Sequence, residues 1–203
     1  MFTGIVQGVG VVTRVADRQG IRRFQIRMPK DYDKGLATGA SIAINGLCLT
    51  VVGWNDQGVQ FDVIDESLRL SNLSELREGS FVNIERAAKF GDEIGGHVLS
   101  GHIHGLGTVI DVVEAEANIA AWVSVPDALS KYVLPKGYVS LNGCSLTVGE
   151  LVKDGQFSIH LIPETRSVTI FGQVCVGDQL NLEIDSQTQA IVDTVERVLD
   201  QRL

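Results

Sequence analysis

The chain has 203 residues, a formal net charge of −8 and 44% hydrophobic residues. This length suits one or two domains, and the acidic balance disfavours a binder of nucleic-acid backbones, which normally presents a basic face. No run approaches the roughly 18 apolar residues of a membrane helix, and the start "MFTGIVQGVG" lacks a basic leader, so we expect a cytoplasmic protein without membrane contact.

The first half of the chain predicts short β-strands. Its runs "GVGVVTRVA", "RRFQIRMP", "ASIAINGLCLTVVGW", "GVQFDVI" and "SFVNIERA" are rich in Val, Ile and Phe and are separated by Gly, Asp and Asn. The Asn-Gly pair inside the third run is typical of a tight hairpin turn. The later stretch "ESLRLSNLSEL" predicts a short helical cross-connection, which Ser67 or Ser71 could cap.

The second half repeats the first. The stretch "NGLCLTV" at 45–51 returns as "NGCSLTV" at 142–148, and "TGIVQGVGVV" at 3–12 returns as "SGHIHGLGTV" at 100–109. Two further blocks follow in the same order, after a slip of one residue. Collinear self-similarity of this kind indicates tandem domains of one fold. We therefore predict an all-β protein with two six-stranded Greek-key β-barrels, at 1–90 and 91–185, because closure removes exposed sheet edges.

The tail 186–203 has no counterpart in the repeat. Its residues Ile191, Val195, Val198 and Leu199 form a helical stripe, and Asp185 or Ser186 could cap the start of the helix. The pattern predicts a C-terminal α-helix. It leaves open whether the stripe packs on its own barrel or forms a coiled-coil seam with sister chains.

Two copies of one barrel predict two similar pockets that differ in reactive groups. Three substitutions add such groups to the second copy: Ile5 becomes His102, Ala87 becomes Asp185, and Cys48 becomes Ser145. Thr50 and Thr147 follow the last pair by two residues, on the same strand face. On local sequence alone, Asp185 is favoured as a helix cap and Cys48 reads as a small core residue. The asymmetry suggests similar ligands in unequal roles.

Three of the four histidines cluster in "GGHVLSGHIHG". His104 replaces the polar Gln7, which favours a structural histidine with satisfied ring nitrogens. Neither His97 nor His102 has further ligands at suitable spacing, so the sequence predicts no metal site.

The three cysteines are an odd set without close spacing, which argues against a disulfide framework.

The motifs together resemble the riboflavin synthase family over essentially the whole chain. They are "MFTGIV", "NGLCLTV", "ERAAKFGDEIGGHVLSGHI", "KGYVSLNGCSLTVGE", "HLIPET" and "NLEID…QTQAIVDTVERVL". The resemblance implies a homotrimer that dismutates two molecules of 6,7-dimethyl-8-ribityllumazine into riboflavin and 5-amino-6-ribitylaminouracil. It implies no metal and no cofactor. Association with lumazine synthase is a further partner that the resemblance allows.

The resemblance also implies site residues between the first barrel of one chain and the second barrel of a neighbour. The first pocket would use Gly4, Ile5, Val6, Ser41, Cys48, Leu49, Thr50, Asp62, Val63, Ile64, Asp65, Glu66 and Ser67. The second would use Gly101, His102, Ile103, Lys136, Ser145, Leu146, Thr147, His160, Leu161, Ile162, Pro163, Glu164 and Thr165. The candidates for chemistry are His97, His102, Cys48, Ser145, Thr147 and Asp185. Within this set, His102 would relay protons, Ser145 would hydrogen-bond the reacting ring, and Asp185 would orient Ser145 or a water. Ile44 and Leu47 depart from the family pattern, and no catalytic role is expected at position 44.

Two other classes of protein remain alternatives. Lumazine proteins share the architecture but bind one chromophore without turnover. In such proteins we expect the second-copy histidines and the "SLTV" stretch to be replaced by other residues. Here "GGHVLSGH" and "CSLTV" are intact. A nucleic-acid-binding barrel of OB type would need aromatic residues interleaved with Lys and Arg, whereas only 6% of residues are aromatic.

Overall fold

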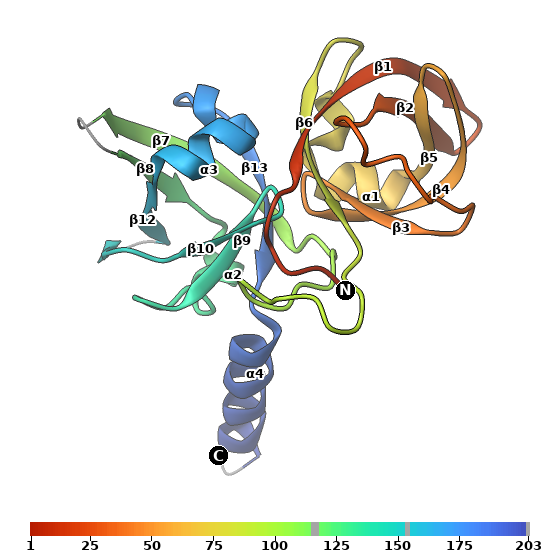
Figure 1. Ribbon diagram of the computed structural model, residues 1–203. Helices are drawn as coiled ribbons and strands as arrows, with labels where there is room; N and C mark the ends of the chain where they lie inside the picture. Colours follow the sequence, from red (N-terminus) through yellow and green to blue (C-terminus); the bar gives the residue numbers. More distant parts are fainter. Residues whose placement is uncertain (115–117, 153–154, 202–203) are drawn as a thin grey trace.

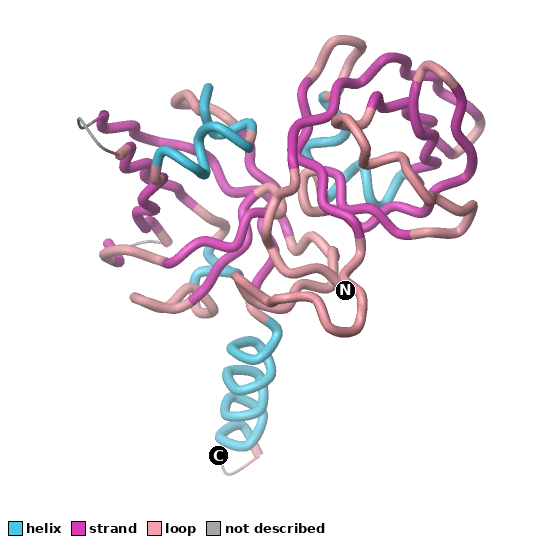
Figure 2. Tube along the Cα trace, in the orientation of Figure 1, coloured by secondary structure: helices cyan, strands magenta, loops and turns pink. Residues whose placement is uncertain are grey.

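The computed structural model describes residues 1–114, 118–152 and 155–201. Two barrels of antiparallel strands lie side by side, and a single helix projects away from the second barrel (Figure 1). Strands and loops make up most of both barrels, and short helical segments lie between some of the strands (Figure 2). The predicted all-β architecture with two tandem barrels and a C-terminal helix is confirmed.

The first barrel closes in the strand order β1-β2-β5-β4-β3-β6. Strands β4 and β5 alternate buried and more exposed side chains, and fully buried Phe24, Phe61 and Ile84 contribute to the core inside the barrel. The elements are β1 (Gly8–Arg18), β2 (Ile21–Arg27), β3 (Ser41–Ile44), β4 (Leu47–Asn55), β5 (Gly58–Ile64), α1 (Asp65–Leu70), the 3₁₀ helix η1 (Asn72–Glu75) and β6 (Phe81–Arg86).

The predicted cross-connection is helical, but its predicted caps are wrong. Helix α1 starts after Ile64, which offers no side-chain cap. Ser71 lies at the other end of the helix, where its hydroxyl donates to the Ser67 carbonyl at 2.6 Å. Serine hydroxyls often bond back to the carbonyl four residues earlier, and this option competes with capping.

The second barrel follows the same plan but is less completely closed. Its sheet order is β10-β9-β13-β7-β8-β12-β11, because the counterpart of β4 is divided into β10 and β11. The elements are β7 (Gly105–Glu114), β8 (Ile119–Ser124), α2 (Asp127–Ser130), β9 (Tyr138–Leu141), β10 (Cys144–Thr147), β11 (Leu151–Val152), β12 (Gln156–Leu161), α3 (Pro163–Val168), η2 (Ile170–Gln173) and β13 (Gln179–Ile184).

The two Asn-Gly turns meet where the barrels join. Asn45 and Asn142 both adopt φ of 45°, as a two-residue hairpin turn requires. The turns pack so closely that a Cβ on Gly46 would lie 2.6 Å from the Gly143 nitrogen. Asn83 and Asn181 complete the junction, since each side-chain amide donates to the carbonyl of the opposite barrel's turn asparagine, at 2.9 and 2.8 Å. The repeated turn motif therefore joins the barrels.

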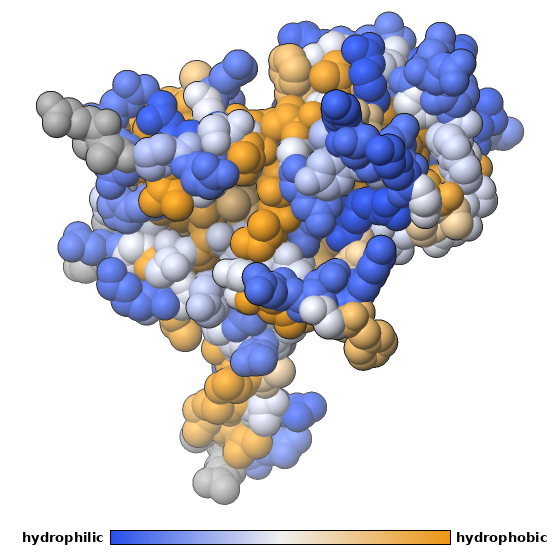
Figure 3. Space-filling view, in the orientation of Figure 1, coloured by the Kyte–Doolittle hydropathy of each residue, from blue (hydrophilic) through white to orange (hydrophobic). Residues whose placement is uncertain are grey.

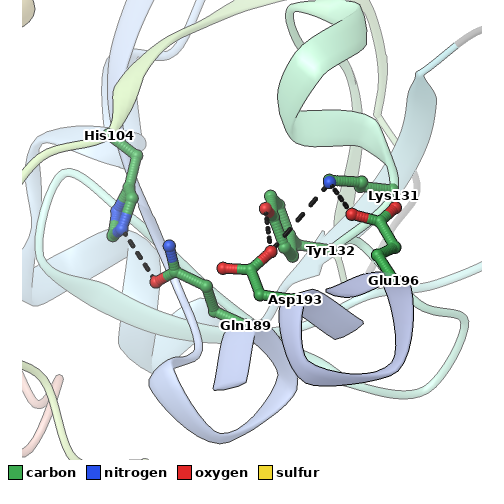
Figure 4. Close-up of polar contacts among 6 residues, drawn as sticks. All are labelled: His104, Lys131, Tyr132, Gln189, Asp193 and Glu196. Carbon is green, nitrogen blue, oxygen red and sulfur yellow. Dashed lines mark hydrogen bonds and ion pairs between the residues drawn. The ribbon is translucent and has the colours of Figure 1, made fainter. Parts of the chain in front are cut away.

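The C-terminal helix α4 (Ser186–Asp200) begins at Asp185, whose carboxylate accepts from the Gln187 and Thr188 amides. This confirms the predicted cap. Three side chains of α4 face the second barrel (Figure 4). Gln189 bonds to His104, Asp193 to Tyr132 and Glu196 to Lys131. Residues 202–203 of the predicted helical tail lie outside the described residues.

The apolar stripe of α4 does not pack on its own barrel. Ile191 is 65% exposed and Leu199 is 55% exposed, and apolar side chains are visible along the projecting helix (Figure 3). Of the two alternatives that the sequence left open, packing against the same chain is excluded for this stripe. Within the described ranges, no helix is long and apolar enough to cross a membrane.

Candidate ligand and catalytic sites

The segment that leads into each barrel crosses to the opposite barrel. The Gly4 carbonyl accepts from the Ser145 amide at 2.8 Å, and the Gly101 carbonyl accepts from the Cys48 amide at 2.8 Å. The two segments also bond to each other, because Phe2 and Leu99 exchange backbone hydrogen bonds of 2.9 Å. Each candidate site is therefore assembled from both halves of the chain.

This exchange corrects the predicted grouping of the pocket residues. The family resemblance placed Gly4, Ile5 and Val6 with Cys48, and Gly101 with Ser145. The structure brings Gly4 to Ser145 and Gly101 to Cys48 instead. The repeat aligns equivalent residues, but it carries no information on which barrel a leading segment covers.

Both crossings require glycine. Gly4 and Gly101 have φ of 74° and 82°, a region that side-chain-bearing residues rarely occupy. A Cβ on Gly4 would lie 2.6 Å from the Ser145 Cβ, and one on Gly101 would lie 2.5 Å from the Cys48 Cβ. The crossing backbones thus lie directly against the two residues that differ between the copies.

The second-barrel site contains a hydrogen-bonded pair of reactive groups. His97 Nδ1 lies 2.6 Å from Ser145 Oγ, and the imidazole stacks on Tyr138 with ring centroids 5.1 Å apart. His97 is buried, and within the described chain its Nε2 has no hydrogen-bond partner. A Cβ on the preceding Gly96 would lie 2.6 Å from the Ser145 Cβ, so glycine is needed for this approach as well.

Burial lowers the pKa of His97, and the negative charge of Asp185 partly opposes that shift. At neutral pH the ring is therefore uncharged and can exchange a proton with Ser145. Burial alone would raise the pKa of Asp185, but hydrogen bonds from Thr188 and Gln187, together with His97, hold it below its ordinary value. Asp185 is thus an anion that acts on His97 through its field.

Asp185 and His102 are not part of the Ser145–His97 hydrogen bond. Both oxygens of Asp185 bond to the start of α4, and it is His97 that hydrogen-bonds Ser145. His102 is exposed, on the segment that crosses to Cys48 in the first barrel. His104 fits its structural assignment, because Nδ1 accepts from the Ile184 amide at 3.2 Å and Nε2 lies 3.3 Å from Gln189 Oε1.

The cysteines next to these sites differ in character. Cys144, which precedes Ser145, is buried, and this burial raises the pKa of its thiol to about 12. Cys48 is half-buried and packs against Phe2, Ala43 and Leu99. Packing is thus established for Cys48, whereas Cys144 is an inert thiol at neutral pH.

Other predicted residues lie on neighbouring strands and at the strand-to-helix connections of each barrel. In the first barrel Ser41 pairs with Thr50 across β3 and β4, and Asp62 to Ser67 span the end of β5 and the start of α1. Arg23 holds Asp62 through two hydrogen bonds of 2.6 Å and lowers the pKa of that carboxyl. In the second barrel, residues 160–165 occupy the equivalent end of β12 and start of α3.

Sequence comparison missed two buried carboxylates, Glu85 and Glu183. Glu85 accepts from the Thr3 amide and hydroxyl at 2.6 and 2.8 Å, and Glu183 accepts from the Ser100 amide and hydroxyl, both at 2.7 Å. The signal was present, because the two glutamates end the matched blocks "EGSFVNIE" and "VGDQLNLE". Burial raises the pKa of Glu85, although its hydrogen bonds oppose this shift.

The fold and the paired sites define a protein of two lumazine-binding domains. The profile described as "Lumazine binding domain" matches residues 3–87 and 100–185, which correspond to the two barrels. A crystal structure of LumP complexed with riboflavin superposes with a TM-score of 0.84 at 29% identity and covers 92% of this chain and 100% of LumP. A complex of LumP with 6,7-dimethyl-8-(1'-D-ribityl) lumazine gives a TM-score of 0.83 at 28% identity, with the same coverage.

Relatives that match over nearly their full length show which lumazine-binding proteins this chain resembles. Riboflavin synthase of Escherichia coli (strain K12) is 49% identical over 203 residues, which covers 100% of this chain and 95% of the relative. Riboflavin synthase of Mycobacterium bovis is 41% identical over 204 residues, covering 98% of both chains. The chain belongs to the riboflavin synthase family.

Proposed function

We propose that this enzyme dismutates 6,7-dimethyl-8-ribityllumazine. One molecule donates a four-carbon unit to another, giving riboflavin and 5-amino-6-ribitylaminouracil. The two substrates together contain every atom of the two products, so the reaction needs no oxidant and no external carbon donor. The protein would act in the cytoplasm as a homotrimer.

The observation that carries this proposal is the pair of equivalent sites with unequal chemistry. Each site has a glycine backbone crossing over the same strand position, which is Cys48 in one barrel and Ser145 in the other. Within the described part of the chain, Ser145 bonds to an imidazole, that of His97, and Cys48 does not. A reaction between two identical molecules in different roles calls for this combination of similar binding and different reactive groups.

The groups present fit the proton transfers of such a reaction. One lumazine must lose a proton from its C7 methyl, and donors placed at the ring oxygens would stabilise the resulting anion. The other must accept a nucleophile at C7. The uncharged His97 and Ser145 can relay a proton at the second-barrel site, and His102 lies on the segment that reaches the first-barrel site. Holding two substrates face to face can supply on the order of 7–11 kcal/mol of the acceleration.

Backbone strain supports a ligand role for Lys136. It adopts φ of 65°, and its amide bonds to the Val148 carbonyl just as the Gly39 amide bonds to Val51 in the first barrel. A lysine in this conformation costs roughly 1–2 kcal/mol, which the equivalent glycine avoids. A contact between the Lys136 ammonium group and the ligand would offset this cost.

The exposed stripe of α4 supports assembly from several chains. Its residues Ile191, Val195, Val198 and Leu199 gain by burial against sister helices, and such an assembly would bring the first barrel of one chain to the second barrel of the next.

Incubation of the purified protein with 6,7-dimethyl-8-ribityllumazine alone tests the proposal. We expect riboflavin to accumulate, with one molecule formed for two consumed, by absorbance and chromatography. Saturable binding without riboflavin would instead identify a chromophore-binding protein of the LumP type. Mixed oligomers test the shared site: chains carrying Ser145→Ala and chains carrying Thr50→Val should regain activity together only if different chains complete one site.

A further inference from the structure

Two buried carboxylates, Glu85 and Glu183, bond to the crossing segments. Glu85 and Glu183 are each 3% exposed. They lie on β6 and β13, at equivalent places in the two barrels. Each binds the same set of donors, namely the amide and hydroxyl of a Thr or Ser and the amide of the following glycine.

Each carboxylate holds a segment that serves the other barrel. Glu85 of the first barrel bonds the Thr3 and Gly4 amides at 2.6 and 3.2 Å, and the Gly4 carbonyl then receives the Ser145 amide of the second barrel. The same segment supports His97 indirectly, because a Cβ on Gly96 would lie 2.4 Å from the Thr3 carbonyl oxygen.

The mirror arrangement starts from the second barrel. Glu183 bonds the Ser100 and Gly101 amides at 2.7 and 3.1 Å, and the Gly101 carbonyl receives the Cys48 amide of the first barrel. A carboxylate is the side chain that accepts all of these donors, whereas an amide would place an N–H group against one of them.

We infer that Glu85 and Glu183 are positioning residues with crossed targets: Glu85 sets the geometry of the Ser145 site, and Glu183 sets that of the Cys48 site. This inference rests on the proposed function, because it takes those two positions as ligand sites. The arrangement also couples the two sites, because each barrel holds the backbone segment that completes the site of the other barrel.

Amide hydrogen exchange with residue-level resolution tests the crossing without any ligand. In full-length Glu85→Gln we expect the Ser145 amide to exchange about tenfold faster or more, because hydrogen bonds to charged groups are among the stronger ones, while the Cys48 amide is unchanged. Glu183→Gln should give the reverse pattern. Glu78→Gln makes the same chemical change at an exposed glutamate and should change neither amide.

An effect confined to the variant's own barrel, or an equal effect on both amides, would overturn the inference. If Glu85→Gln does not fold, Thr3→Val removes the hydroxyl that donates to Glu85 and accepts from the Ile5 amide. It should accelerate exchange at Ser145 to a smaller degree, while Thr3→Ser should restore the normal rate. Steady-state kinetics show whether the loosened backbone affects the reaction. For both glutamine variants, the fold decrease in kcat should exceed the fold change in KM. A wild-type protein without turnover would refute the proposed function, yet the exchange pattern would still decide the crossing.

Discussion

Replacing Ser145 by alanine removes one hydroxyl from the second-barrel site. In the folded protein this hydroxyl lies 2.6 Å from His97 Nδ1, and the other ring nitrogen of His97 already has no partner within the described chain. The substitution therefore leaves a buried imidazole without either hydrogen bond. Leaving a buried polar group unsatisfied costs about 1–3 kcal/mol.

If the Ser145–His97 contact is stronger in the transition state than in the enzyme–substrate complex by this amount, its loss appears in kcat. A loss of 1–3 kcal/mol corresponds to a decrease in kcat of about five- to 150-fold. The equivalent change at the first site, Cys48→Ser, keeps the side-chain volume and alters packing against Phe2, Ala43 and Leu99. We expect it to reduce kcat by less than about fivefold, because no hydrogen bond to a neighbouring side chain is broken.

The assay is riboflavin formation from saturating lumazine, with riboflavin affinity measured on the same samples. Ser140→Ala is the matched control, since Ser140 lies directly across the strand pair from Ser145 and its buried hydroxyl has no partner within the described part of the chain. It should keep kcat and thermal stability. Equal losses of kcat in the Ser145 and Cys48 variants, with substrate still bound, would refute the asymmetry between the two sites.

Three further outcomes are expected. Deleting 187–203 should leave a folded monomer by sedimentation that binds lumazine but has lost most turnover, because the exposed stripe of α4 goes with it; a fully active monomer would place the reaction within one chain. In Asp185→Asn the acidic limb of kcat/KM should move to lower pH, because removing the carboxylate lowers the pKa of His97 further, while asparagine still caps α4; a limb that moves to higher pH would contradict this. Dialysis against EDTA should leave turnover unchanged, and activity that zinc restores after such dialysis would show a metal requirement.

The sequence by itself determined the architecture, because the relevant signals are local or repeated. Strands, Asn-Gly turns and the amphipathic tail follow from short-range patterns, and the second "NGxxLTV" stretch shows that the same fold occurs twice. It also pointed to Cys48 and Ser145 as the positions where the two sites differ. The cap at Asp185 and the structural character of His104 were likewise predictable, since both depend on neighbours close in sequence or on the aligned copy.

Only the tertiary structure decided how the sites are assembled. Gly4 and Ser145 lie in different copies, and nothing in a repeat alignment shows that the leading segments cross between barrels. The alignment compared His102 with Ile5 and so marked it as a difference between the copies, whereas His97 belongs to the connecting segment 86–99, which has no aligned partner. That segment reaches Ser145 because Gly96 allows close approach of its backbone. Long-range contacts of this kind depend on which surfaces remain open after each barrel has formed, and this is a property of the packed chain rather than of any local pattern.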